Sequence, residues 1–180
     1  MVHPEFTPGA PDEVDLALLR FAEPLRFPRP IPLQTVPDEQ GKTVTLVGWG
    51  YFGLGTTGRQ YDDGRFRLAE NRIEQVGSRF IIRFDDPRED QSDVTRLEGM
   101  PGLGDSGGPA LLPTTDFWTV AGVAVGEIVD SGFTEETQGR YGALAVYERI
   151  SEHLDWIQLT MATHGSGPAT EPEVSGERND

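Results

Sequence analysis

Short apolar runs separated by turn residues fill the chain up to about Gly142 and predict an all-β protein. Apolar or alternating runs of this length are typical of strands. The predicted strands are Leu16–Phe21, Thr43–Trp49, Arg79–Phe84, Trp118–Val125 and Tyr141–Tyr147. Glycine (22 residues) and proline (14 residues) recur between them and leave no room for long helices. Because no alternation of strands and helices is visible, the pattern favours a sandwich or a barrel.

One stretch near the C-terminal end has a different period and predicts a helix. Its apolar residues Ile150, Leu154, Ile157 and Met161 are spaced four, three and four positions apart, which places them on one helical face. After Met161 the chain is polar and rich in small residues and proline, with almost nothing to bury. Residues 162–180 are therefore expected to form a disordered tail. A proline-rich stretch over 28–40 is expected to be an extended connector.

Charge and composition exclude several classes of function. Lys and Arg number 15 against 30 Asp and Glu, giving a net charge of −15, which argues against nucleic-acid partners and anionic lipid surfaces. There is no cysteine, so disulfides, thiol catalysis and cysteine-based zinc sites are excluded. With 3 histidines, we expect neither a metal site nor a cofactor. No apolar run approaches the ~20 residues of a membrane span, and the N-terminal residues lack a signal-peptide pattern.

The segment Gly104-Asp105-Ser106-Gly107-Gly108-Pro109 carries the chemistry. A serine between glycines lies where the backbone approaches another molecule closely or adopts a positive φ. The amides of Gly104 and Ser106 are placed to point into one concavity and stabilise an oxyanion there. A bare Gly-x-Ser-x-Gly is equally compatible with a glycine-rich turn that happens to contain serine, but the full hexapeptide is far more specific.

This hexapeptide resembles the nucleophile segment of chymotrypsin/trypsin-like serine proteases, in particular the cysteine-free bacterial type. Other segments resemble that family in the same chain order. They are the catalytic-Asp segment Asp15–Arg20, the start of the second barrel Val47–Gly50, the cleft strand Gly122–Gly126, and Tyr147 followed by a helix with Trp156. The resemblance covers nearly everything from His3 to Met161. It implies a chymotrypsin-like double β-barrel closed by a C-terminal helix.

The resemblance also implies roles for individual residues. Ser106 would be the nucleophile, and Asp15, buried beside its strand, would orient an imidazole base. Gly104 and Ser106 would supply the oxyanion-hole amides. Asp105 occupies the place where the family pairs a carboxylate with a new N-terminal amine. The family further implies a protein or peptide substrate, an extracellular or periplasmic location, and a monomer at full length.

The resemblance also assigns residues to the substrate pocket. Met100 lies six residues before Ser106, where the trypsin subgroup carries an aspartate that recognises Arg or Lys. The remaining pocket positions are Val125, Gly126, Glu127 and Ala145. An apolar or small P1 side chain is favoured, with Glu127 as an alternative source of negative charge.

The general base of the family has no counterpart among the histidines. The family's catalytic His lies several dozen residues before the Asp, and only fourteen residues precede Asp15. His3 is too close to Asp15, His153 is expected on the surface of the helix, and His164 falls in the tail. We therefore interpret the chain as an N-terminally truncated and inactive fragment. Its parts are a remnant of the first barrel (1–27), the connector (28–40), the second barrel with its helix (41–161) and the tail (162–180).

Two other functions remain open at this stage. The first is an α/β-hydrolase that uses Ser106 on a nucleophile elbow with Asp130 and His153. Gly107-Gly108-Pro109 opposes it, because the elbow needs a helix directly after the serine. The second is a catalytically dead protease-like domain that binds proteins.

Overall fold

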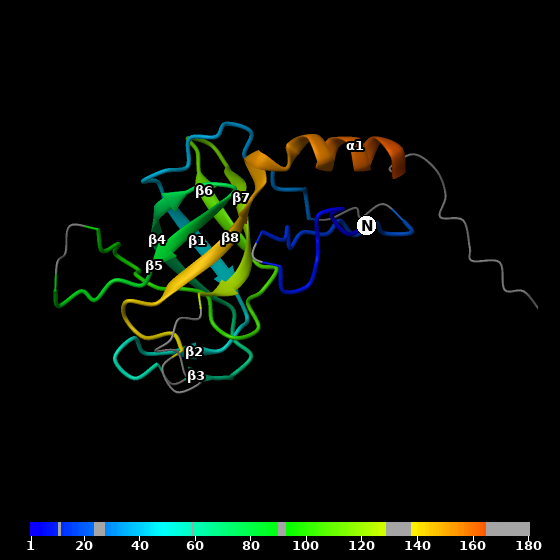
Figure 1. Ribbon diagram of the computed structural model, residues 1–180. Helices are drawn as coiled ribbons and strands as arrows, with labels where there is room; N and C mark the ends of the chain where they lie inside the picture. Colours follow the sequence, from blue (N-terminus) through cyan, green and yellow to red (C-terminus); the bar gives the residue numbers. More distant parts are fainter. Residues whose placement is uncertain (11, 24–27, 59, 90–92, 129–137, 165–180) are drawn as a thin grey trace, which may run out of the picture.

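Antiparallel strands close into a single barrel in the structure, which is a computed structural model (Figure 1). The structure describes residues 1–10, 12–23, 28–58, 60–89, 93–128 and 138–164. The strands are β1 (Thr43–Gly48), β2 (Phe52–Gly53), β3 (Gln60–Tyr61), β4 (Arg67–Val76), β5 (Arg79–Arg83), β6 (Pro109–Pro113), β7 (Trp118–Glu127) and β8 (Leu144–Arg149). The barrel order is β1-β4-β5-β8-β7-β6, and β2 pairs with β3 separately. The predicted all-β barrel class is confirmed.

Alternating burial explains why these segments form the barrel. In β1, Val44 and Leu46 are buried while their neighbours are not, and in β5 Phe80 and Ile82 repeat the pattern. This period of two places one face of each strand in the core. The ring of Phe80 stacks on that of Tyr147 from β8, with centroids 5.0 Å apart. The core is completed by Ile73, Ala110, Leu112, Ala121, Ala124 and Ala145.

Four of the five predicted strands are confirmed, with some of their ends displaced. They correspond to β1, β5, β7 and β8, of which β7 runs on to Glu127 and β8 begins only at Leu144. Strand β4 was not predicted, because its inward positions include Asn71 as well as Ile73. The Asn71 side chain donates to the backbone carbonyls of Arg83 and Gly99, which satisfies its buried amide.

The predicted strand Leu16–Phe21 is wrong. In this segment only Ala17 forms a β-bridge, to Val2, and no regular strand occurs in the described residues ahead of Thr43. Leu16 is buried, but Leu19 and Phe21 are 85% and 61% exposed. An apolar run becomes a strand only where a second strand accepts its backbone hydrogen bonds. The described part of the chain offers this segment a single bridge.

The predicted connector follows the outside of the barrel along β7. Leu33 forms a parallel bridge to Val120, whose amide donates to Pro32 O (2.8 Å) and whose carbonyl accepts from Gln34 N (2.9 Å). The extended conformation predicted from its prolines is thus held by backbone bonds to the barrel. The domain boundaries stay a prediction.

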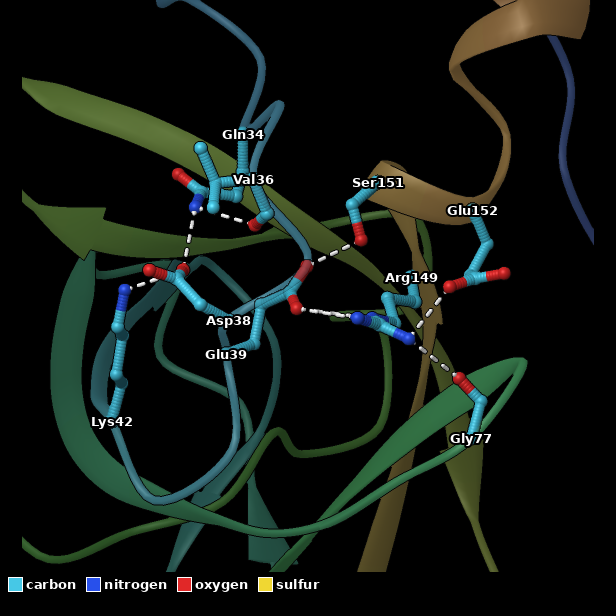
Figure 2. A network of polar contacts seen from close by, with 9 residues as sticks. All are labelled: Gln34, Val36, Asp38, Glu39, Lys42, Gly77, Arg149, Ser151 and Glu152. Atoms are coloured by element: carbon cyan, nitrogen blue, oxygen red, sulfur yellow. Dashed lines mark hydrogen bonds and ion pairs between the residues drawn. The ribbon is translucent and has the colours of Figure 1, made fainter.

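A buried ion pair ties the connector to the end of β8 (Figure 2). Glu39 is fully buried, and its carboxylate lies 2.8 Å from Nη2 of Arg149, itself 6% exposed. Ser151 donates to the same carboxylate, while Arg149 also reaches Glu152 and the carbonyl of Gly77. Buried charges are tolerated when they are paired and hydrogen-bonded in this way.

The predicted helix is present, but it is divided. A short 3-10 helix, η1 (Ile150–Glu152), precedes α1 (Leu154–His164). On the predicted face, Ile150 and Ile157 are buried, whereas Met161 is 60% exposed. The helix includes residues 162–164, so the predicted tail cannot begin at 162, and residues 165–180 lie outside the described part. Neither described helix has the length and apolarity that a membrane span requires.

Close packing of β7 on β5 generates a testable prediction. A Cβ on Gly122 would lie 2.5 Å from Cε1 of Phe80, so Gly122→Ala forces the ring or the strand to move. We expect the free energy of unfolding to fall by about 1–3 kcal/mol, as is typical of overpacked cores. Gly126 on the same strand has nothing within 4 Å of its Cβ position, so Gly126→Ala is the matched control. Urea unfolding measures both, and equal losses in the two variants would contradict the packing.

Candidate active site

Ser106 lies exposed on the glycine-rich turn that leads into β6. Gly104 and Gly107 adopt φ values of +90° and +81°, which an L side chain rarely adopts. Asp105 N donates to Gly102 O (3.1 Å) and Gly108 N to Asp105 O (2.9 Å), so the turn folds back on itself. The predicted close turn around the serine is therefore present. Glycine is needed at positions 104 and 107 because φ is positive there.

Strand β7 holds this turn in place. Gly107 N donates to Ala124 O and Ala124 N to Gly108 O, both at 2.8 Å. The pairing of β7 with β8 shifts register between Ala124 and Gly126, which leaves Val125 in an irregularity of the ladder. Such irregularities free a backbone group from strand pairing. Val125 O accepts the hydroxyl of Ser106 at 3.3 Å.

The side chain of Asp105 points beneath the turn toward the end of β1. Its Oδ1 accepts Gly50 N (2.7 Å) and its Oδ2 accepts Gly102 N (2.9 Å). A Cβ on Gly48 or Gly50 would lie 2.0 Å or 2.4 Å from atoms of this carboxylate. This role of the Gly-Trp-Gly motif was not predicted, although its two glycines are a sequence signal of close approach.

The amides predicted to form the oxyanion hole are available. Within the described residues, neither Gly104 N nor Ser106 N donates to another backbone group. Both belong to the exposed turn that carries Ser106. Their assignment to an oxyanion hole stays a proposal.

The residues predicted for the substrate pocket are divided between two places. Met100 lines a cavity of about 220 Å³, together with Gly50, Gly102, Asp105 and Tyr147. The other predicted residues, Val125, Gly126, Glu127 and Ala145, lie on β7 and β8, where Glu127 pairs with the buried Ala145.

The Glu127 carboxylate is half-buried near the end of β7. It accepts Gly139 N at 3.0 Å, and burial raises its pKa above the ordinary value despite that hydrogen bond. The Gly139 amide therefore already binds the carboxylate whose negative charge was expected to be available to a substrate.

Asp15 is exposed, so the prediction that it is buried is wrong. Its neighbours Val14 and Leu16 are buried and anchor the segment, but the missing strand pairing leaves Asp15 itself uncovered. Its backbone amide donates to Glu148 Oε1 of β8 at 2.8 Å. Burial works to raise the pKa of Glu148, but the close contact with His153, the hydrogen bonds from Arg79 and the Asp15 amide, and the charge of Arg79 outweigh it and lower the pKa.

His153 was expected on the surface and is instead buried. Its Nε2 lies 3.3 Å from Glu148 Oε2 but has no hydrogen-bond partner among the residues that the structure describes. The centroid of the His3 ring lies 5.2 Å from that of His153 and 4.7 Å from that of Trp156. These three residues form a His-Trp cluster that joins the N-terminal segment to α1. No local pattern in the sequence predicts this contact, because the residues are about 150 positions apart in the chain.

The fold excludes the α/β-hydrolase alternative. That fold requires a parallel sheet and a helix after the serine, whereas Ser106 is followed by β6 and every barrel pairing is antiparallel. Asp130 lies outside the described residues. Among the described residues, no group of three or more acidic or histidine side chains is arranged to hold a metal ion.

An antiparallel barrel with an exposed serine on a glycine-rich turn defines the class of β-barrel serine proteases. The family model described as Trypsin matches residues 1–157, and the chain belongs to this family. The resemblance inferred from the motifs is thereby confirmed.

Three curated relatives are similar to the chain at the sequence level. Vitamin K-dependent protein C of Oryctolagus cuniculus is 26% identical, over 93% of this chain and 37% of that protein. Ovochymase of Halocynthia roretzi is 26% identical, over 88% and 10%. Phenoloxidase-activating factor 3 of Holotrichia diomphalia is 27% identical, over 80% and 41%. The chain therefore spans less than half the length of these relatives.

One solved structure shares the fold. Neuropsin, a serine protease expressed in the limbic system of mouse brain, matches with a TM-score of 0.52 and 18% identity. The match covers 74% of this chain and 54% of that chain.

The His-Trp cluster predicts how stability depends on pH. Burial and the nearby His153 lower the pKa of His3 below its ordinary value of 6.5, although Glu5 and Glu148 oppose them. The unfolded chain therefore binds a proton at His3 more readily, so the free energy of unfolding falls as the pH drops through and below 6.5. Replacing the titrating ring by His3→Gln should flatten this fall.

Urea unfolding between about pH 8 and pH 5 measures the effect. His164, exposed at the end of α1, provides the control variant His164→Gln, which should keep the wild-type slope. An unchanged slope in His3→Gln would contradict the assignment.

Proposed function

We propose that the chain carries the nucleophile and the orienting acid of a serine endopeptidase, Ser106 and Asp15. The observation that carries this proposal is the turn at Ser106. Its hydroxyl is exposed, its backbone is held by β7 and by Asp105, and two amides beside it are unused by the described backbone. Fixed amides aimed at a developing oxyanion are usually the largest single contribution to acyl transfer. A protein-binding domain without catalysis is the alternative function.

The reaction follows from these groups. Ser106 Oγ attacks the carbonyl carbon of the scissile peptide bond while an imidazole takes its proton. The same imidazole then protonates the leaving amine, and an acyl-enzyme remains on Ser106. Water hydrolyses this ester and regenerates the hydroxyl. Asp15 would hold the imidazole in its reactive tautomer. We propose proteins or peptides outside the cytoplasm as substrates.

We propose that the imidazole base comes from outside residues 1–180. His3 and His153 are occupied in the cluster with Trp156, and His164 lies at the exposed end of α1. The hydroxyl of Ser106 faces the carbonyl of Val125, not an imidazole. We propose that a longer gene product supplies the base and that residues 1–180 alone do not cleave peptides.

The first test compares the two forms of the protein. Residues 1–180 should show no casein hydrolysis and no stoichiometric labelling by a fluorophosphonate, because positioned proton transfer typically contributes ~10²–10⁴-fold. In the longer, active product, Ser106→Ala should lower kcat/KM by roughly 10⁴- to 10⁶-fold.

Two outcomes would contradict the proposal in different ways. Stoichiometric labelling of residues 1–180 that is lost in His153→Ala would show that this chain supplies its own base. A longer product that neither cleaves peptides nor reacts with the fluorophosphonate would favour the protein-binding domain instead.

The second test concerns specificity. Met100 is half-buried, packs against the barrel core and lines the cavity near Asp105, so we expect an apolar or small P1 side chain to be preferred. A P1-varied peptide library assayed with the active product measures this preference. Met100→Asp should shift it toward Arg and Lys, since a carboxylate pairs with either cation. A wild-type preference for Arg that disappears in Glu127→Gln would show that Glu127 sets the specificity instead.

A further inference from the structure

A buried carboxylate on β8 meets the segment that carries Asp15. Glu148 is 1% exposed, and its Oε1 accepts the backbone amide of Asp15 at 2.8 Å. The two residues are 133 positions apart in sequence. An ionised carboxylate in the interior needs strong partners, because its transfer out of water is costly. A backbone amide is thus one of the groups that satisfy it.

Arg79 on β5 adds a second connection to the same segment. Its Nε and Nη2 lie 2.7 Å and 2.6 Å from Glu148 Oε1, and Nη2 also donates to the carbonyl of Glu13. The pair of side chains therefore holds the backbone at two points, the carbonyl of Glu13 and the amide of Asp15. Two contacts two residues apart define both the position and the direction of this short segment.

In the described part of the chain, the backbone hydrogen bonds of the N-terminal segment are mainly internal to it. The N-terminal residues bond mainly to one another, as in His3 N to Leu16 O (2.9 Å) and Leu18 N to Met1 O (2.8 Å). They form a local unit that lies beside β8 and beneath α1 (Figure 1). Glu148 and Arg79 join this unit to the barrel, and the His-Trp cluster joins it to α1.

The barrel in turn links Glu148 to the serine. Glu148 pairs with Val123 of β7, and two residues further along β7 the carbonyl of Val125 accepts the hydroxyl of Ser106. Asp15 is thus connected to Ser106 through Glu148 and its pairing with β7.

We infer that Glu148 is a positioning residue, which with Arg79 fixes the backbone of Asp15 in register with Ser106. The inference rests on the role proposed above for Asp15. Glu148 itself touches neither the substrate nor Ser106, and acts through the amide of Asp15.

The test separates positioning from stability by replacing the whole ion pair. In the double variant Glu148→Met with Arg79→Met, apolar side chains of similar size replace both charges, a change that proteins often tolerate without loss of stability. The matched control is the double variant Glu39→Met with Arg149→Met. It removes the other buried ion pair, drawn in Figure 2, whose Arg149 directly follows Glu148 in β8. That pair contacts no residue of the Glu13–Asp15 segment.

The first readout is amide hydrogen exchange in residues 1–180 and does not depend on activity. We expect exchange at Asp15 to accelerate by roughly tenfold or more relative to barrel amides in the Glu148/Arg79 double variant only. Equal effects at Asp15 in the test and control variants would overturn the inference. Should the double variant not fold, Glu148→Gln and Glu148→Met replace it. Glu148→Gln keeps a hydrogen-bond acceptor for the Asp15 amide, whereas Glu148→Met does not. Equal protection of the Asp15 amide in these two variants would therefore also overturn the inference.

The second readout uses the longer, active product. Loss of register should lower kcat by roughly 10²-fold with little change in KM, the effect expected of misplaced catalytic groups. Glu148→Gln should restore most of it. If Ser106→Ala leaves activity intact, the proposed function is wrong, and the exchange experiment still decides whether Glu148 positions the segment.

Discussion

The pairing of β1 with β6 is the constraint on which the rest of the site depends. It joins Thr45 to Leu111 and Leu46 to Ala110, and it closes the sheet into a barrel. Because β6 begins directly after the serine turn, this closure also brings the turn to the end of β1. There the amide of Gly50 meets the carboxylate of Asp105. One short strand pairing thus completes the core and places the candidate nucleophile.

Buried charges join the segments outside the barrel to it. Glu148 and Arg149 are successive residues of β8, and successive side chains of a strand point to opposite faces. Glu148 binds the segment of Asp15, and Arg149 binds Glu39 of the connector. Ion pairs of this kind contribute little net stability compared with apolar packing, but removing one partner is costly. Their consequence here is that two loosely paired segments have one defined place on the barrel.

The candidate site could be predicted from the sequence only where its geometry is local. The turn at Ser106 was predicted correctly, because glycines around a serine determine backbone conformation within a few residues. The environments of Asp15 and His153 were predicted wrongly, since burial depends on what packs against a residue from elsewhere in the chain. Asp15 lacks the strand partner that would cover it, and His153 is covered by His3 from the far end of the chain.

The sequence by itself determined the strand periods of β1, β5 and β7, most of the helix and the conformation of the serine turn, because side-chain alternation and glycine act over short distances. Tertiary structure alone decided the strand order, the shelter of Asp105 between Gly50 and Gly102, and the contact of Glu148 with Asp15. These contacts join residues separated by up to 133 positions, and no local pattern specifies which distant groups will meet. Barrel closure supplies that information, since it fixes which strand ends become neighbours.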